Sequence, residues 1–443
     1  MSEIPNHLLV NYHFKTIEQL QERVAAAVAV GANAGKLEEF RTLLRSNLFM
    51  PAGNTLLAGS IPIYPNCCVL PCVTDDNLDE IKTRSLNLWK HRTGTGFSLG
   101  PCSDPVAAMR TLLDAHATVT FGEERCQRGN MMALPSTHPR IEEFVRFKKD
   151  HANYTAVNIS VTFVDEDEVH RFLGTDVGQL ALQCAVETGC PGMIFLWRFE
   201  PGVKTTVPCG ELGILPNESC NLGAINLGNE KFVDSAGGVN FDLLYDTVRS
   251  AVSFLDAVID VQCFVDEEMA RVTTQEKRRV GLGVGGWADM LERMGLAYDS
   301  TEAVCLDRVI AEQINTAALL ESYQIHKKKK KKDKGAVRNV TLTCAQPTGS
   351  ITPLMGNKGY AIEPFFHEAT KLSKQAHVEM QAAWQSGVQN GISKTVNLPC
   401  EATAEDVREV VLLALEKGCK SVTVYRDKSH AAQPQPLGDC KGC

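Results

Sequence analysis

No run of about 18 apolar residues occurs in the sequence, so no membrane-spanning helix is expected. The first residues, MSEIPNHLLVNYHFK, lack the charged-then-apolar layout of a signal peptide, and we expect a cytoplasmic protein. An excess of positive charge is missing as well. Lys and Arg number 45 against 53 Asp and Glu, and the net charge of −8 argues against nucleic acid as a partner.

Linkers rich in proline or serine are absent between residues 47 and 430, and no repeat is found, so one domain is expected there. Its β-like runs (CCVLPCV, AVNISVTFV, VTLTC and SVTVY) alternate with helix-like segments, which is typical of a mostly parallel α/β sheet or barrel. Residues 15–46 predict two helices divided by GANAG. The expected domains are a helical segment at 1–45, an α/β unit at 46–430 and a mobile polar tail at 431–443.

Cysteine, by contrast, is abundant, with 16 residues. A small secreted chain with so many would be a disulfide scaffold, but in a long chain without an export signal most should be reduced. A few are expected to carry redox or radical chemistry. Four others lie in helix-like apolar stretches, where a free thiol packs as a small apolar group: Cys184, Cys263, Cys305 and Cys419.

Two conspicuous patterns have ordinary explanations. The run from Lys327 to Lys332 is interpreted as a solvated loop between a helix and a strand, rather than as a nucleic-acid contact. The segment GLGVGG at 281–286 has the spacing of a dinucleotide-binding loop, but the polar TTQEKRRV precedes it where a strand is required. These glycines are expected to serve packing or a turn.

The segment VPCGELGILPNESCNLGAINL places a cysteine and a carboxylate two residues apart, at Cys209 and Glu211. A loop of this kind can combine a nucleophilic or radical thiol with an acid/base group, and Cys220 could reach the same pocket. A loop with incidental cysteines explains the pattern equally well.

The chain ends in a Cys-x-x-Cys pair, Cys440 and Cys443. A dithiol on a mobile arm can shuttle electrons between a buried site and an outside reductant. No second Cys or His pair lies near it to complete a zinc site, and no side chains are predicted to ligate a metal. Two unconstrained terminal cysteines are the alternative.

Small-residue turns suited to a ligand occur in two places. Residues 347–351 (Pro-Thr-Gly-Ser-Ile) follow the strand-like VTLTC, and such a turn can offer N–H and hydroxyl groups to a phosphate. The Gly-Lys-Ser/Thr ending of a Walker A loop is missing there. Residues 93–97 (Thr-Gly-Thr-Gly-Phe) follow a helix, and their glycines allow a ligand to approach the backbone closely.

In combination, these motifs resemble the catalytic subunit of ribonucleotide reductases, most closely the adenosylcobalamin-dependent class II enzymes, in an unusually short form. The resemblance covers about residues 45–443, and its motifs follow in family order: NCCVLP, GTGF, QRGNMMALPSTHPRIEEFVR, NISVTF, PCGE, ESCNLGAINL, RRVGLGVGGWADML, QPTGSITPL, SKTVNLP, GCKSVTVYRD and the terminal Cys-x-x-Cys. The glycine-radical motif of another class is absent. Tyr360 and Tyr425 do not form the adjacent tyrosine pair of the diiron class.

The resemblance implies an α/β fold, namely a ten-stranded barrel of two five-stranded parallel halves with a central finger loop that carries the radical cysteine. By match to the family motifs, Cys209 is the thiyl radical that abstracts the ribose 3′-hydrogen, and Glu211 is the general base at the 3′-hydroxyl. Cys220 is one member of the redox pair that reduces the 2′-position. Its partner lies in NCCVLP, where Cys67 fits the family order better and Cys68 stays open.

The resemblance also assigns the tail and the substrate contacts. Cys440 and Cys443 would re-reduce the redox pair after each turnover. Residues 347–351 would hold the diphosphate. The positions matched to substrate contacts are Asn66, Gly94, Val207, Pro208, Gly210, Pro347, Thr348, Gly349, Ser350 and Ile351. The implied cofactor is adenosylcobalamin, and the implied activity is reduction of ribonucleotides to 2′-deoxyribonucleotides.

Position 207 is valine where the family motif has asparagine, so another group must hydrogen-bond there or activity is impaired. A short segment at 98–106 and the lack of an N-terminal ATP-binding extension predict weak effector control. The expected partners are a ribonucleoside di- or triphosphate and a thioredoxin- or glutaredoxin-like reductant, with a dNTP effector and a homodimer left open. The alternatives are a catalytically impaired relative that binds nucleotides or regulates, and a different thiol enzyme on a similar barrel.

Overall fold

The computed structural model of the chain describes residue 8 and residues 12–32, 34–121, 124–126, 128–328 and 337–429. The predicted tail at 431–443, with Cys440 and Cys443, lies outside these residues, as do Lys329 to Lys332. Lys327 and Lys328 end the long helix α12 (Thr301–Lys328), so the first two lysines of the run are helical and exposed rather than part of a loop.

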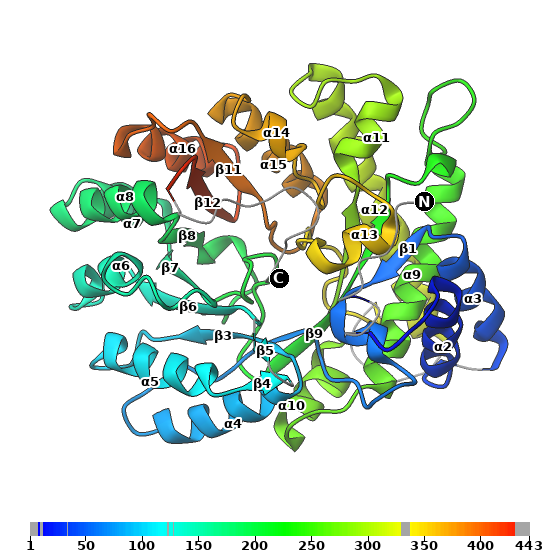
Figure 1. Cartoon of the computed structure of the whole chain (residues 1–443), viewed down its shortest axis with the longest axis horizontal. Helices are drawn as coiled ribbons and strands as arrows, with labels where there is room; N and C mark the ends of the chain where they lie inside the picture. The colour runs from blue at the N-terminus through cyan, green and yellow to red at the C-terminus, as the bar shows by residue number, and fades with distance from the viewer. Residues whose placement is uncertain are drawn as a thin grey trace.

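The first half of the barrel is a parallel sheet in the order β2-β3-β6-β7-β8 (Figure 1). Its strands are β2 (Cys67–Val69), β3 (Gly94–Ser98), β6 (Asn130–Pro135), β7 (Val157–Phe163) and β8 (Gly192–Phe195). The helices that accompany them are α4 (Leu78–Lys90), α5 (Pro105–Ala117), α6 (Ile141–Asp150), α7 (Glu166–Leu173) and α8 (Asp176–Thr188). A separate two-stranded ribbon pairs β4 (Thr120–Phe121) with β5 (Glu124–Arg125).

The second half contains β9 (Glu218–Asn226), β10 (Val280–Gly285), residues 341–345, β11 (Thr395–Leu398) and β12 (Ser421–Arg426). Parallel pairing joins β9 to β10 and β11 to β12, and single bridges, Leu282 to Thr343 and Ala345 to Ile392, continue the order between them. The halves meet antiparallel at β2–β9 and β8–β12, which closes the barrel. The predicted barrel of two parallel halves is confirmed, although the expected strand VTLTC contributes only a single bridge, at Thr343.

The remaining helices cover the second half and the ends of the barrel. They are α9 (Phe241–Val261), α10 (Glu267–Arg271), α11 (Trp287–Met294), α13 (Thr352–Met355), α14 (Phe366–Ala369), α15 (Lys374–Gly387) and α16 (Ala404–Glu416). Short helical turns are η1 (Ala34–Lys36), η2 (Gly53–Leu57), η3 (Leu196–Arg198), η4 (Glu230–Phe232) and η6 (Gly349–Ile351), and η5 (Val272–Lys277) is a π-helix.

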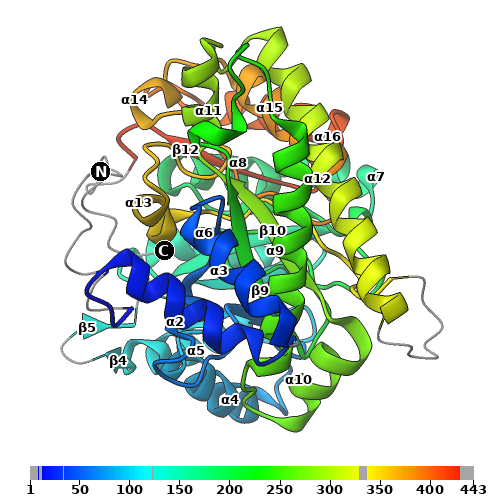
Figure 2. The same ribbon diagram turned by 90° about the vertical axis from the view of Figure 1, so that its right-hand side faces the viewer.

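The two predicted N-terminal helices are present as α2 (Ile17–Ala29) and α3 (Leu37–Arg45). Thr16 begins α2, because its hydroxyl accepts a hydrogen bond from the backbone N–H of Gln19. Both helices lie against α9, and the next strand, β1 (Phe49–Pro51), adds to the edge of β9 (Figures 1 and 2). This segment therefore shares a core with the barrel, and the division at residue 45 stays a prediction.

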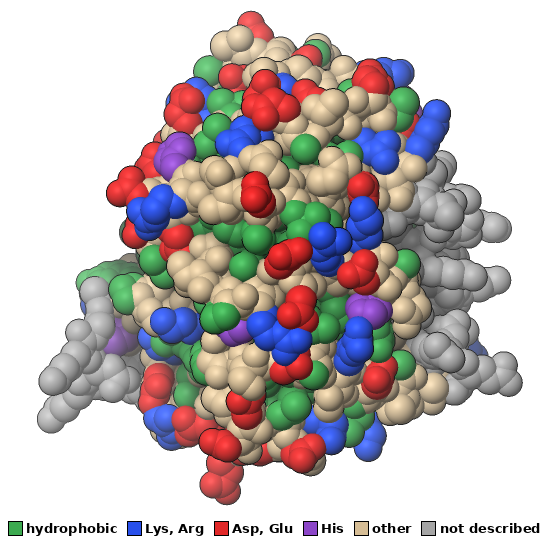
Figure 3. Space-filling model, turned by 90° about the vertical axis from the view of Figure 1, so that its left-hand side faces the viewer, with side chains coloured by type: hydrophobic (Ala, Val, Ile, Leu, Met, Phe, Trp, Pro, Cys, Tyr) green, Lys and Arg blue, Asp and Glu red, His purple; other side chains and the backbone are tan. Residues whose placement is uncertain are grey.

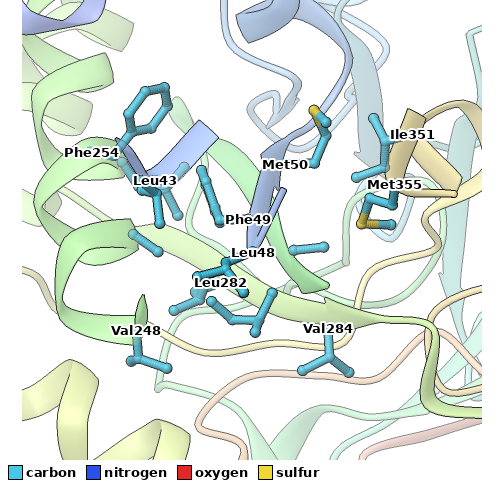
Figure 4. Packing of buried hydrophobic residues seen from close by; sticks show 14 of the residues in the cluster. Leu43, Leu48, Phe49, Met50, Val248, Phe254, Leu282, Val284, Ile351 and Met355 are labelled. Carbon is cyan, nitrogen blue, oxygen red and sulfur yellow. The ribbon is translucent and has the colours of Figure 1, made fainter. Parts of the chain in front are cut away.

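Apolar packing on the second half joins all these elements. Figure 4 shows Leu43 of α3, Phe49 of β1, Phe254 of α9 and Leu282 of β10 in one cluster. The ring of Phe254 lies 5.1 Å from that of Phe40 and 5.5 Å from that of Phe49, edge to face. Each such buried side chain stabilises the fold by roughly 1.5–3 kcal/mol. A second large cluster lies between the strands and helices of the first half.

Residues 281–285 of the GLGVGG run lie in strand β10, and Gly286 precedes α11 with a φ of +73°, so the dinucleotide-loop interpretation is wrong and the packing or turn role is confirmed. A Cβ on Gly281 would lie 2.4 Å from Leu222, and one on Gly283 would lie 2.1 Å from the side-chain oxygen of Gln346. Side chains from neighbouring segments therefore fill the space over this strand, and only glycine fits.

The four cysteines expected in the core divide evenly. Cys184 and Cys419 are buried, as predicted. The prediction is wrong for Cys263, which follows the end of α9, and for Cys305, which lies on the outward face of α12. Helical spacing alone could not tell which side of an outer helix faces water.

Charges of both signs are interspersed on the face that carries α6 and α8 (Figure 3), where Lys149 and Glu187 form an ion pair at 2.7 Å. Within the described ranges, no helix combines the length and the apolar character needed to cross a membrane.

Candidate active site

The cysteine and carboxylate found in the sequence lie on the loop between β8 and β9, residues 203–217, which we call the finger loop. It folds as a narrow hairpin, because Thr206 bridges Gly213 and the N–H of Val207 donates to the carbonyl of Leu212 at 2.9 Å. The residues between them, 208–211, form its tip.

Cys209 occupies the turn at that tip. The N–H of Gly210 donates to the carbonyl of Val207 at 3.0 Å, so Pro208 and Cys209 are the two central residues of the turn. Gly210 then adopts a φ of +83°, which favours glycine. The Pro-Cys-Gly sequence therefore holds the Cys209 thiol at the end of a tight, well-defined turn, where the residue is half-buried.

Glycines of the first half let the finger loop lie inside the barrel. A Cβ on Gly96 of β3 would lie 2.2 Å from the carbonyl oxygen of Thr206. A Cβ on Gly94 would lie 3.0 Å from Pro208, and one on Gly129 would lie 3.1 Å from the same ring. The GTGF motif is thus explained by contact between strand and loop backbones.

Other elements fix the loop from both halves of the barrel. The side-chain amide of Asn158, on β7, donates to the carbonyl of Pro208 at 2.9 Å. From the second half, the N–H of Gly391 donates to the carbonyl of Glu211 at 2.9 Å, and Asn390 accepts from the N–H of Gly213 at 2.8 Å. Contacts with both halves place the loop in the barrel interior.

Adding one methyl group at Gly96 should therefore displace the finger loop. We expect Gly96→Ala to lower the rate of product formation about a hundredfold, because misplacement by about 1 Å can cost that much. Gly174→Ala is the control, since the nearest atom to its Cβ is 3.4 Å away and its φ of −80° suits alanine. Assays of product, with thermal melts to check folding, test this. Parent-like activity of Gly96→Ala would contradict it.

Strand register distinguishes the two adjacent cysteines of NCCVLP. Cys67 lies directly opposite Cys220 where β2 pairs with β9, and Cys68 lies opposite Ser219. Successive side chains of a strand point to opposite faces. Cys67 accordingly packs on the interior cluster that contains Cys220, whereas Cys68 belongs to the outer core of the first half. The arrangement favours Cys67 as the partner of Cys220.

Burial raises the pKa of the Cys67 and Cys220 thiols well above the ordinary value, and the nearby Glu211 carboxylate adds to the effect. Burial likewise raises the pKa of Cys68. Both interior thiols therefore stay protonated at neutral pH and carry hydrogens that can be given up on oxidation.

Glu211 is 2% exposed, and burial raises its pKa to about 7. Its own N–H and that of Cys209 partly oppose the shift. One carboxylate oxygen, Oε2, has no hydrogen-bond partner among the described residues. A carboxylate with a pKa near neutrality and a free oxygen suits a general base.

Val207, which precedes the Cys209 turn, belongs to an apolar cluster in the barrel interior. Its side chain is fully buried in the interior cluster, whose other members are Val69, Leu212, Ile214, Cys220, Leu222 and Cys344. Cys344 is a further buried thiol that sequence reasoning missed, because it precedes the PTGSI turn and matched no motif. Burial, together with Glu211 and Cys67, raises the pKa of Cys344 well above its ordinary value.

Asn66 and Gly94 flank the thiol pair. Asn66 donates through Nδ2 to the carbonyl of Ala52 and accepts through Oδ1 from the N–H of Leu222, both at 3.2 Å. Gly94 pairs with Cys67 in the sheet, and its Cβ would lie 3.2 Å from the Cys67 sulfur. Arg128, also missed, places its guanidinium within 3.8 Å of a Cβ on Gly53, beside Asn66. The QRGN motif that contains Arg128 was the sequence signal that could have identified it.

The turn at 347–351 lies beyond the carboxyl end of β10 rather than on the finger loop. The Thr348 hydroxyl contacts that of Thr352 at 2.7 Å and accepts from the N–H of Ala361 at 2.7 Å. Thr348 also packs on Gly285, the last residue of β10. These contacts join this turn to the second half of the barrel.

The barrel carries a cysteine and a carboxylate on an interior loop, and two further thiols face each other from paired strands. These features are those of a thiol-bearing α/β-barrel enzyme. The family model described as "Ribonucleotide reductase, barrel domain" matches residues 175–334 and 357–425, which is more than half of the chain. The chain belongs to the ribonucleotide reductase family.

Similar proteins include the vitamin B12-dependent ribonucleoside-diphosphate reductase of Mycobacterium tuberculosis, which is 29% identical over 95% of this chain and 78% of its own length. The enzyme of the same name from Thermoplasma acidophilum is 29% identical over 92% of this chain and 67% of its own. The α subunit of the class Id ribonucleotide reductase of Actinobacillus ureae has the same fold, with a TM-score of 0.82, 16% identity and 97% coverage of both chains.

Proposed function

We propose that the chain reduces ribonucleotides to 2′-deoxyribonucleotides through a thiyl radical at Cys209, with adenosylcobalamin as the cofactor. One observation carries the proposal: Cys67 faces Cys220 in the strand register, next to the loop that holds Cys209 and Glu211. Similarity to the vitamin B12-dependent enzymes supports the choice of cofactor.

The proposed chemistry assigns a task to each side chain. The Cys209 thiyl takes the hydrogen atom from C3′ of the ribose, and ionised Glu211 accepts the 3′-hydroxyl proton. The 2′-hydroxyl then leaves as water. Cys67 and Cys220 supply two electrons and two protons and become a disulfide, so one ribonucleotide and two thiols give one deoxyribonucleotide, water and one disulfide. Cys209 then returns the hydrogen atom to C3′ and becomes a thiyl radical again, and Glu211 returns the proton to the 3′-oxygen.

The cofactor would act on the Cys209 thiol at the tip of the finger loop. Bound adenosylcobalamin would supply a carbon radical able to take the thiol hydrogen of Cys209. Short polar side chains of neighbouring strands pack closely on Gly192 of β8: its Cβ would lie 3.1 Å from the Ser160 hydroxyl and 3.2 Å from that of Thr423, which is exposed. Ser421 lies 3.7 Å from a Cβ on Gly210, next to the cysteine.

The substrate contacts are proposed in the same terms. Asn66, Gly94, Pro208 and Gly210 surround the thiols, and the turn at 347–351 would hold the diphosphate. The described contacts of Asn66 with Ala52 and Leu222 suggest that it acts by fixing the strands as well. Cys440 and Cys443 are proposed to re-reduce the pair with a thioredoxin- or glutaredoxin-like protein, and a dNTP effector and a homodimer belong to the same proposal.

Incubation of the purified chain with adenosylcobalamin, a ribonucleotide and dithiothreitol tests the function directly. We expect deoxyribonucleotide to form only when adenosylcobalamin is present, as measured by chromatography of the products. Turnover with a diiron subunit and no cobalamin would overturn the class assignment.

Val207 supports a second candidate function, in which the chain is a catalytically impaired relative that binds nucleotides. Its buried apolar side chain cannot hydrogen-bond where the family motif has asparagine. The same assay separates the two, because an impaired relative would bind the nucleotide and yield no product under any cofactor condition.

A further inference from the structure

The N-terminal segment reaches the turn at 347–351 from 338 residues away. The hydroxyl of Tyr12 donates a hydrogen bond to the hydroxyl oxygen of Ser350 at 3.2 Å. Tyr12 is 4% exposed, whereas Ser350 is half-buried. A ligand at the turn can therefore touch Ser350 but not Tyr12.

Burial fixes the position of this segment. Leu8 and Phe14, on either side of Tyr12, are 3% and 7% exposed and belong to the large core of the second half. Arg23 of α2 donates to the carbonyl of Tyr12 at 2.8 Å and to that of His13 at 2.9 Å. Tyr12 is thus held from both its backbone and its ring.

The same arginine connects the segment to the redox thiols. Arg23 also donates to the carbonyl of Leu56, in η2, at 2.8 Å. Asn54 of η2 in turn donates to the carbonyl of Pro65 at 2.9 Å, two residues before Cys67. Hydrogen bonds, together with the η2 backbone from Leu56 to Asn54, therefore connect the turn at 347–351, through Tyr12 and Arg23, to Pro65, two residues before β2.

We propose that Tyr12 is a positioning residue for the substrate diphosphate, an inference that rests on the proposed function. Because the Ser350 oxygen accepts from Tyr12, its own hydrogen is directed away from the tyrosine and is available to a phosphate oxygen. Arg23, which bonds to the Tyr12 carbonyl, also ties this segment to η2.

Tyr12→Phe tests this, because it keeps the packed ring and removes only the hydroxyl. We expect KM for a ribonucleotide to rise about threefold to tenfold, the worth of one hydrogen bond, with kcat within about twofold of the parent. Binding of CDP, measured by calorimetry, should weaken by the same factor, and the weak binding of cytidine should not change. Equal affinity of the parent and Tyr12→Phe for CDP would overturn the inference.

A double-mutant cycle shows whether Tyr12 acts through Ser350. Ser350→Ala should weaken CDP binding at least as much as Tyr12→Phe, and the double variant should bind like Ser350→Ala alone. Additive effects would overturn the positioning role. Tyr154→Phe is the matched control, since the Tyr154 hydroxyl donates to Asp114 at 2.6 Å on the first half of the barrel. The Tyr154→Phe variant should bind CDP with the affinity of the parent. A parent chain that binds no CDP would instead refute the proposed function itself.

Discussion

Replacing Cys209 with serine should reduce deoxyribonucleotide formation by at least about a thousandfold. A thousandfold loss corresponds to about 4 kcal/mol in the activation barrier, and the O–H bond of serine exceeds the S–H bond of cysteine by more than that. The serine oxygen would occupy the same turn, held by Pro208 and by the hydrogen bond from Gly210 to Val207, so geometry should be preserved. Product assays with adenosylcobalamin and dithiothreitol measure the loss.

Cys305→Ser is the control for that variant, because Cys305 is exposed on α12 and lies on no strand of the barrel. It should retain the activity of the parent. Thermal melts of both variants should match the parent within a few degrees. Residual activity in Cys209→Ser above about one per cent would show that another group carries the radical.

Glu211→Gln should lower kcat by about a hundredfold to ten-thousandfold, the usual worth of a general base. Since burial raises the pKa of Glu211 to about 7, the parent should lose activity as the pH falls below that value, as its base becomes protonated. Above it, the rate should level off. The amide variant should show no such inflection, and a pH–rate profile of both chains makes the comparison.

Stability provides the check on that variant. A carboxyl whose pKa is raised in the folded chain favours folding below its unfolded pKa and loses that contribution as the pH rises through about 7. Glu211→Gln should therefore be at least as stable as the parent at pH 8. Glu312→Gln, at an exposed position of α12, is the control and should keep the parental profile. A destabilised Glu211→Gln that kept its pH inflection would contradict the assignment.

Alternating strand-like and helix-like runs predicted a mostly parallel α/β sheet or barrel, and the resemblance of the ordered motifs to a known family implied the ten-stranded barrel. The family order favoured Cys67 and left Cys68 open, since adjacent residues of a strand differ only in the face they present, and pairing with β9 decides that face. The contact between Gly96 and Thr206 was also out of reach, because it joins two backbones that are far apart in the chain.

Residues missed by sequence reasoning share one physical character, which is that they act through tertiary contact. Cys344 enters the interior cluster only because β10 lacks side chains beside it: a Cβ on Gly281 would lie 3.0 Å from its sulfur. Tyr12 acquires its contact with Ser350 through packing of the N-terminal segment on the second half. The local sequence pattern around Cys344 and Tyr12 indicates neither of these contacts.

The location of the thiol pair has a mechanical consequence. Cys67 and Cys220 lie on β2 and β9, which form one of the two seams where the antiparallel halves of the barrel meet. In the proposed reaction, each turnover would place a covalent crosslink across that seam, and each re-reduction would remove it. A crosslink between distant parts of a chain restricts its unfolded state. The two halves of the barrel would thus be covalently linked in the oxidised chain and free of that link in the reduced chain. The redox state of the chain would therefore also set how strongly this seam is constrained.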